Sequence, residues 1–233
     1  MDVKTFYDEY VECQTTVGIN DRHRSILKWL QQSGLRPDHR VLEIGCGVGT
    51  LTQLLAEALP QGFVLGIDLS PKSIDASREL LALSHNVGLM AANVLEAELE
   101  DHFDVIVLPD VIEHIPLDHH PALFERVASW VRADGFVLLH YPNPHYLEWC
   151  REHRPDLLQI IDQPVHADVL LSNTYRSGLH IDFLAKYAIW IREGDYTVAV
   201  LRPAAGTRTF TDMPARRPSP LARVRGLARR IAS

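Results

Sequence analysis

The stretch VLEIGCGVGTLT, residues 41–52, decides the fold of this chain. An apolar segment runs into three glycines, Gly45, Gly47 and Gly49, and a helical pattern of apolar residues follows directly. Glycine is needed where a turn takes a positive φ or where backbone must approach a ligand closely. The helix after the turn also presents its free N–H groups to whatever lies in front of it. The stretch therefore predicts a strand, a tight turn and a helix that together cradle a ligand.

The glycine spacing and two acidic residues narrow the choice of ligand. The dinucleotide-binding pattern G-x-G-x-x-G requires its third glycine at position 50, where this chain has Thr50. Glu43 precedes the first glycine, and a second predicted strand, residues 63–68, ends in Asp68. A carboxylate at the tip of the second strand is placed to bind the two hydroxyl groups of a ribose. We therefore expect a ligand that contains adenosine.

Together with GIDLSPKSI, residues 66–74, the glycine stretch resembles the class I S-adenosylmethionine-dependent methyltransferases that act on small molecules. The resemblance implies a Rossmann-like, doubly wound α/β fold with a seven-stranded sheet, mostly parallel with an antiparallel final strand. It also implies S-adenosyl-L-methionine as the cofactor, with the glycine loop facing its methionine part and Asp68 its ribose. By motif, the resemblance covers about residues 38–141.

The same resemblance assigns further residues to the cofactor. FDVIVLPDVIEHIP, residues 103–116, resembles the DVIEHI segment of these enzymes, which places Leu108 and Pro109 along the cofactor. Asn93, at the end of a predicted strand over residues 86–93, is expected at the adenine edge or, alternatively, as a turn residue. The expected cofactor-binding residues are Glu43, Gly45, Cys46, Gly47, Gly49, Asp68, Leu69, Asn93, Val94, Leu108, Pro109 and Tyr10.

Composition predicts one catalytic domain, because 233 residues with 46% hydrophobic content can build a full core. The resemblance implies that this is a methyltransferase domain, and its predicted sheet is complete by residue 203, so we expect the domain to cover residues 1–203. No run of about 18 apolar residues suggests a membrane helix, and the first residues are charged rather than signal-like, so we expect a cytoplasmic protein. Cys13, Cys46 and Cys150 lie far apart, so neither a disulfide framework nor a zinc site is expected. No other metal site is expected.

Residues 1–34 are predicted to form two helices with a break before Asn20 or Asp21, either of which suits a helix cap. In methyltransferases of this type such a segment often folds over the cofactor as a lid; otherwise it packs as a surface helix. The polar contacts of such a lid would be Tyr7, Tyr10, Gln14 and Arg24.

The second half of the chain is predicted to complete the sheet and cover the acceptor site. Residues 142–166 contain four prolines and exceed an ordinary strand-to-helix link, so we interpret them as a cap insertion. A helix ending at Gly178 follows, and residues 180–193 and 195–203 are predicted as an antiparallel pair of strands.

Charge is unevenly distributed and bears on partners. Residues 213–233 hold six arginines and no acidic residue, which leaves residues 1–212 at −13 within an overall charge of −7. Because a domain with this negative charge repels the phosphate backbone, we do not expect a nucleic-acid substrate. Residues 204–233 are expected to form a flexible, basic tail that either frays or contacts an anionic membrane or partner. The sequence leaves the oligomeric state open.

We therefore expect a methyltransferase that acts on a small-molecule acceptor such as a sugar, a lipid precursor or a secondary metabolite. An oxygen or carbon acceptor needs a base, and His114 is the first candidate, followed by His140 and His145. His114 also suits a capping or surface role. Two alternatives stay open: a non-catalytic S-adenosylmethionine-binding scaffold, and a nicotinamide-dependent oxidoreductase, which Thr50 disfavours.

Overall fold

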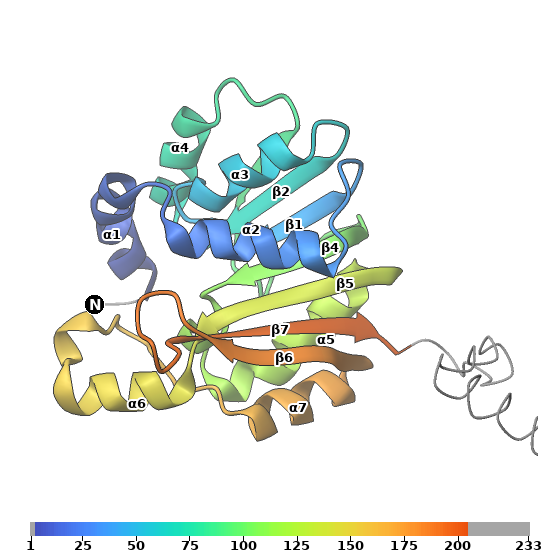
Figure 1. Cartoon of the computed structure of the whole chain (residues 1–233). Helices are drawn as coiled ribbons and strands as arrows, with labels where there is room; N and C mark the ends of the chain where they lie inside the picture. Colours follow the sequence, from blue (N-terminus) through green and yellow to red (C-terminus); the bar gives the residue numbers. More distant parts are fainter. Residues whose placement is uncertain (1–2, 205–233) are drawn as a thin grey trace, which may run out of the picture.

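A computed structural model describes residues 3–204, without the side chains of residues 3, 4, 10 and 13 (Figure 1). The strands are β1 (Arg40–Ile44), β2 (Phe63–Asp68), β3 (Val87–Ala91), β4 (Phe103–Pro109), β5 (Val131–Pro142), β6 (Leu179–Tyr187) and β7 (Tyr196–Pro203). The helices are α1 (Val3–Val17), α2 (Asp21–Ser33), α3 (Thr50–Ala58), α4 (Pro71–Leu80), α5 (His120–Trp130), α6 (Pro144–His153) and α7 (Ala167–Arg176). Short 3-10 turns span Ile112–His114, Leu117–His119 and Pro155–Leu157.

The described strands form one seven-stranded sheet in the order β3-β2-β1-β4-β5-β7-β6. Neighbouring strands from β3 to β5 pair in parallel, and β7 is antiparallel to both β5 and β6. This arrangement confirms the expected doubly wound α/β fold with its antiparallel final strand. The predicted basic tail covers residues 204–233, of which all but residue 204 lie outside the described residues.

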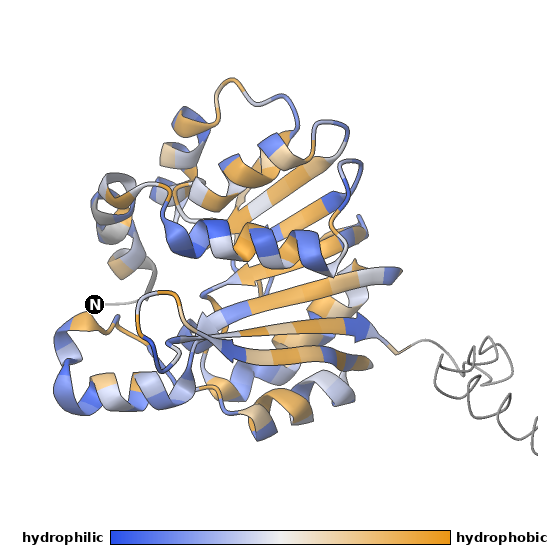
Figure 2. Cartoon of the chain, viewed as in Figure 1, coloured by the Kyte–Doolittle hydropathy of each residue, from blue (hydrophilic) through white to orange (hydrophobic). Residues whose placement is uncertain are grey.

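Two apolar layers sandwich the sheet. On one face, α2 and α3 pack residues such as Ile26, Leu30 and Leu55 against the strands, and α5 and α7 pack on the other face. β4 lies at the centre, and its residues 105–108 are 0% exposed, as expected for a parallel strand covered on both sides. Each such side chain contributes about 1.5–3 kcal/mol by leaving water. Figure 2 shows the apolar strands between helices whose outer surfaces are polar.

Helix ends follow the chemistry read from the sequence. The Asn20 side chain accepts from the backbone N–H groups of Arg22 and His23 and so caps α2, and Gly34 ends that helix at φ 112°. Ser70 caps α4 by accepting from the Ser73 N–H at 3.1 Å. The Asn20 contacts confirm the predicted break between the first two helices. All of these contacts satisfy N–H or C=O groups that a helix terminus leaves unpaired.

Two predicted boundaries were wrong. The strand predicted over residues 180–193 ends at Tyr187, and a loop follows. The Asp195 carboxylate holds this loop by accepting from the N–H groups of Ile189 and Trp190 at 2.8 and 3.1 Å. The apolar run FVLLHY, residues 136–141, predicts a strand that starts at Phe136, but β5 begins at Val131, because the chain leaves α5 directly into the sheet with an irregular register beside Phe103.

Helices α1 and α6 lie at the end of the molecule where the parallel strands have their carboxyl ends (Figure 1). α1 packs on α4, and the Ser70 hydroxyl donates to the Asp8 carboxylate across this contact at 2.5 Å. No helix within residues 3–204 is both long and apolar enough to cross a membrane. Helices α1 and α6 thus lie beside the carboxyl ends of the parallel strands, where open α/β sheets bind ligands.

Candidate functional site

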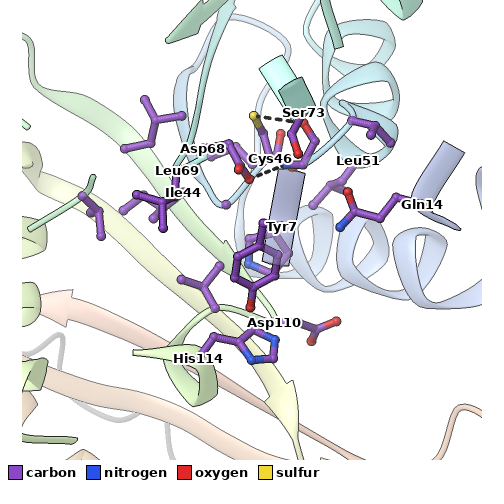
Figure 3. Close-up of a pocket in the computed structure, with 18 of the residues that line it drawn as sticks. Tyr7, Gln14, Ile44, Cys46, Leu51, Asp68, Leu69, Ser73, Asp110 and His114 are labelled. Atoms are coloured by element: carbon purple, nitrogen blue, oxygen red, sulfur yellow. Dashed lines mark hydrogen bonds between the residues drawn. The ribbon is translucent and has the colours of Figure 1, made fainter. Parts of the chain in front are cut away.

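A cavity of about 520 Å³ opens at the carboxyl ends of β1, β2 and β4 (Figure 3). Its size falls within the range of about 300–1,000 Å³ typical of small-molecule sites. The first wall is the glycine loop with Glu43 and Asp68, and the second is α1 with the start of α2, including Tyr7 and Gln14. The third wall is the segment after β4, including His114. The cavity therefore gathers the residues of both sequence motifs.

The glycines of the loop serve two purposes. Gly47 has φ 53° and lines the cavity, and a Cβ there would lie 3.0 Å from Oε1 of Gln14. Gly49 has φ 85° and faces α4, where a Cβ would lie 2.4 Å from Oγ of Ser77. Gly49 is not among the residues that line the cavity. Gly47 thus keeps space open for a ligand, whereas Gly49 allows close packing of the loop on a helix.

Asp68 braces the glycine loop. Its two carboxylate oxygens accept from the N–H groups of Gly47 and Ser70 at 2.8 and 2.9 Å. Burial raises the pKa of Asp68, and these backbone hydrogen bonds offset part of that rise. Asp68 and the adjacent Leu69 both line the cavity. Asp68, at the end of β2, therefore fixes the glycine loop and also lines the cavity.

Glu43 is a buried acid with one unused oxygen. The residue is 1% exposed, and its Oε2 accepts from the Thr52 hydroxyl at 2.6 Å. Its Oε1 has no hydrogen-bond partner among residues 3–204. Burial raises the pKa of Glu43 to about 8. Because an unpaired buried acceptor costs about 1–3 kcal/mol, this oxygen fits a donor or a cation supplied by a ligand in the cavity.

The far end of the cavity is lined by Asn93 and Val94. The Asn93 side chain forms a turn, because its Oδ1 accepts from the Leu95 N–H at 3.0 Å and its Nδ2 donates to Glu96 at 3.1 Å. Of the two roles that the sequence left open for Asn93, the structure shows the turn. Leu108, which was expected along the cofactor, is 0% exposed and does not line the cavity.

Most of the expected cofactor-binding residues come together around this cavity. Those that line it are Glu43, Gly45, Cys46, Gly47, Asp68, Leu69, Asn93, Val94 and Pro109. The side chain of Tyr10 is not described. Tyr7 and Gln14, also on α1, line the cavity, whereas Arg24, on α2, is exposed and does not.

Asp110 is a wall residue that the sequence reasoning did not identify. It is the only non-glycine residue in the described chain with a positive φ, at 54°. Its carboxylate pairs with the Arg22 guanidinium and lies 2.8 Å from Nδ1 of His140. Burial raises the pKa of Asp110, but Arg22 and His140 outweigh it and hold that pKa at about 2. The position at the end of a buried strand was the available clue.

The structure places His140 behind Asp110, away from the cavity. His140 is 0% exposed, and its Nε2 lies 2.7 Å from the Tyr187 hydroxyl. Its ring stacks on Tyr196 with a centroid separation of 4.5 Å. His145 is likewise outside the cavity, because it lies on the exposed surface of α6 beside Glu148. Neither histidine reaches the space that His114 faces.

His114 lines the cavity from the 3-10 turn after β4. Its Nδ1 lies 2.5 Å from the Ile161 carbonyl oxygen and 3.1 Å from Oδ1 of Asp162, and its Nε2 lies 3.7 Å from Oε1 of Glu113. Burial lowers the pKa of His114, but Glu113, Asp162 and the Ile161 carbonyl outweigh burial and raise it to about 9. The Tyr7 ring points toward His114 from α1, with centroids 6.0 Å apart (Figure 3).

The predicted cap insertion reaches the cavity only through a short stretch, at Gln159 and Ile161. Trp190, in the loop between β6 and β7, also lines the cavity, as do Arg22 and His23 of α2. The sequence did not predict these three residues at the site. Within residues 3–204, no group of three or more His, Cys, Asp and Glu side chains is arranged to hold a metal ion.

Two curated relatives illustrate the sequence similarity. Phosphoethanolamine N-methyltransferase 3 of Arabidopsis thaliana is 34% identical over 137 residues, which cover 53% of this chain and 26% of that protein. Magnesium-protoporphyrin O-methyltransferase of Synechocystis sp. PCC 6803 is 30% identical over 124 residues, which cover 52% of each chain. The matched region thus spans about a quarter to a half of the length of these relatives.

The solved structure of the Synechocystis magnesium protoporphyrin IX methyltransferase with bound S-adenosylhomocysteine has a TM-score of 0.61 to this chain. It is 21% identical, with 78% of this chain and 82% of that chain covered. This likeness supports the fold. A family model described as a methyltransferase domain matches residues 19–184, well over half of the chain. The chain therefore belongs to this methyltransferase domain family.

Proposed function

We propose that this protein is an S-adenosylmethionine-dependent methyltransferase that acts on a small molecule. The observation that carries the proposal is the unused Glu43 oxygen beside the glycine loop, inside a cavity of about 520 Å³. A cationic ammonium group in front of Glu43 would satisfy that oxygen and favour the ionised carboxylate. Family membership points to the same cofactor.

The residues present fit the parts of this cofactor. Glu43 would hold the methionine ammonium group, and Asp68 would hold the ribose hydroxyl groups. Arg22 lines the cavity and has a buried Nε without a hydrogen-bond partner among the described residues, which suits the methionine carboxylate. Because Gly47 lines the cavity and has no side chain, its backbone would be able to approach the ligand closely.

When bound, this cofactor supplies a methyl group already attached to a cationic sulfur. The protein then has to orient the acceptor, exclude water and accept a proton where the acceptor carries one. The segment containing Gln159 and Ile161 lines the cavity opposite residues of α1, and these two elements would exclude water from a bound acceptor. His114 is the proposed base. Because its pKa is raised to about 9, it becomes a competent base as the pH approaches that value.

The acceptor is proposed to be small, because one cavity of about 520 Å³ must hold the cofactor and the acceptor together. The named relatives also act on small molecules, phosphoethanolamine and magnesium-protoporphyrin. We further propose a cytoplasmic location, which the unpaired, buried thiols of Cys46 and Cys150 support.

A transfer assay with methyl-labelled S-adenosylmethionine tests this proposal against the scaffold alternative. The protein is incubated with a panel of small amines, phenols and carboxylic acids, and the Gly47→Val variant serves as the matched negative control. We expect label transfer to at least one acceptor class by the wild type only. Cofactor binding without transfer across the panel would favour the non-catalytic scaffold.

A further inference from the structure

His114 joins two segments that lie far apart in the sequence. It belongs to the 3-10 turn after β4, and its Nδ1 contacts the segment 158–163 of the cap insertion, at the Ile161 carbonyl and the Asp162 carboxylate. The same two segments are joined by the Gln163 N–H, which donates to the Glu113 carbonyl at 2.9 Å. The cap therefore determines how the imidazole is oriented in the cavity.

These contacts fix which imidazole nitrogen carries a proton. A carbonyl oxygen only accepts hydrogen bonds, so Nδ1 must be the donor at its 2.5 Å contact with Ile161. An ionised Asp162 carboxylate, 3.1 Å from the same nitrogen, imposes the same direction. When His114 is neutral, its lone pair must therefore lie on Nε2.

We propose that Asp162 is a positioning residue that, with the Ile161 carbonyl, holds His114 as the Nδ1–H tautomer and keeps Nε2 as the base for the methyl acceptor. This inference rests on the proposed methyltransferase function. It adds a residue from the cap insertion to the acceptor site, and it assigns the imidazole nitrogen that takes the proton.

Asp162 is itself held in place. It is 8% exposed in its side chain, and its Oδ2 accepts from the Gln159 N–H at 2.7 Å. Its backbone carbonyl accepts from the Arg151 guanidinium at 2.5 Å. These contacts hold the Asp162 carboxylate against the imidazole, so it restricts the ring to one orientation. The carboxylate that hydrogen-bonds a catalytic histidine has the same effect in other enzymes.

Several charged groups around His114 set its affinity for a proton. Glu113, on the same turn, is 1% exposed, and burial raises its pKa to about 8. Asp110 at the end of β4 and Asp162 on the cap are the other acids that act on the ring, and Tyr7 faces it from α1. These three acids favour the charged imidazolium, so His114 must lose a proton to solvent before it can act as a base.

The transfer step balances with His114 in this role. The acceptor atom forms a bond to the methyl carbon, the sulfur–methyl bond breaks, and its electron pair stays on sulfur. The acceptor's proton moves to Nε2 of His114, which becomes the imidazolium that Asp162 stabilises. The acceptor class is therefore one whose attacking atom has a lone pair and carries a removable proton, such as a hydroxyl group.

Nitrogen NMR of histidine-labelled protein tests the tautomer without any need for turnover. Because the chain has 12 histidines, the His114 signals are assigned by their loss in His114→Gln. We expect the neutral ring to be protonated at Nδ1, and Asp162→Asn to move the titration midpoint to lower pH by about 1. A neutral ring protonated at Nε2 in the wild type, or an unmoved midpoint in Asp162→Asn, would overturn the inference.

Kinetics against pH provide the second test, with Asp156→Asn as the matched control. Asp156 lies in the same insertion but is exposed and pairs only with Arg154 in the described structure. In Asp162→Asn we expect the rise of kcat with pH to shift to lower pH and its plateau to fall about tenfold, with the KM for the cofactor unchanged. If Asp162→Asn instead lowered kcat equally at every pH, with no shift of the pH profile, Asp162 would have only a structural role and the inference would be wrong. If cofactor binding itself fails, the proposed function fails, and the NMR result still decides the tautomer.

Discussion

Two of the three walls of the cavity, the glycine-loop wall and the wall after β4, are built in different ways. The glycine-loop wall comes from two short stretches of sequence, and its contacts are mainly backbone hydrogen bonds, such as those that Gly47 and Ser70 donate to Asp68. The wall after β4 is held by side chains from distant parts of the chain. Asp110 is fixed by Arg22 of α2 and His140 of β5, 88 and 30 positions away.

The difference shows which site residues can be predicted from local sequence and which cannot. A loop that needs positive φ and close backbone approach must use glycine, so its chemistry is visible in the sequence. A side chain in a network depends on partners that only the tertiary fold brings near. Changes to the glycine-loop wall should therefore act mainly on ligand binding, and changes to the wall after β4 on stability and catalysis.

Gly47→Val should produce the largest effect, a loss of S-adenosylmethionine affinity of more than about 100-fold, because the new side chain fills the cavity beside Gln14. Gly178→Val is the matched control, since Gly178 also has a positive φ, 80°, but nothing lies within 4 Å of its Cβ position. The control should lose about 1–2 kcal/mol of stability from backbone strain and keep its affinity. If both variants lost the same affinity, the loss in Gly47→Val would come from backbone strain and not from filling the cavity.

Asp110→Asn should lower the free energy of unfolding by about 2 kcal/mol at pH 7, because it removes the charge that pairs with Arg22 and His140. The folded-state pKa of Asp110 is depressed to about 2, so this stability is present above the unfolded pKa and is lost as the pH falls through 2. Denaturant unfolding from pH 7 to pH 2 should show the difference shrinking. The exposed Asp75→Asn should change little at any pH.

Glu43→Gln should weaken S-adenosylmethionine binding about tenfold and abolish its pH dependence. Burial raises the pKa of Glu43 to about 8, and a bound ammonium group lowers it, so binding releases a proton below pH 8. Wild-type affinity should therefore rise from pH 6 to 8 and then level off. Titrations in buffers of different ionisation enthalpy measure the released proton; an equal pH dependence in Glu43→Gln would exclude Glu43 as its source.

Asn93→Ala should have the smallest effect, less than about threefold on affinity, because both polar ends of this amide are engaged in its own turn. The same titration measures it. A loss of affinity beyond tenfold would mean that the Asn93 side chain leaves its turn and binds the ligand directly.

The sequence predicted the sheet, the glycine loop and the position of His114 because each depends on local pattern. It did not predict Asp110, Arg22 or Trp190 as wall residues, because their roles arise from elements that meet only in the folded chain. The strand end near Tyr187 was misjudged for a similar reason. The apolar residues after it favour a strand, but the Asp195 carboxylate binds the backbone of that stretch as a loop.

Calorimetric titration of the purified protein with S-adenosylmethionine, S-adenosylhomocysteine and NADH in parallel tests the central claim most directly. We expect both sulfur compounds to bind at a single site, with micromolar affinity that Gly47→Val abolishes, and NADH not to bind. Binding of NADH alone, or of none of the three, would contradict the assignment of this cavity to S-adenosylmethionine.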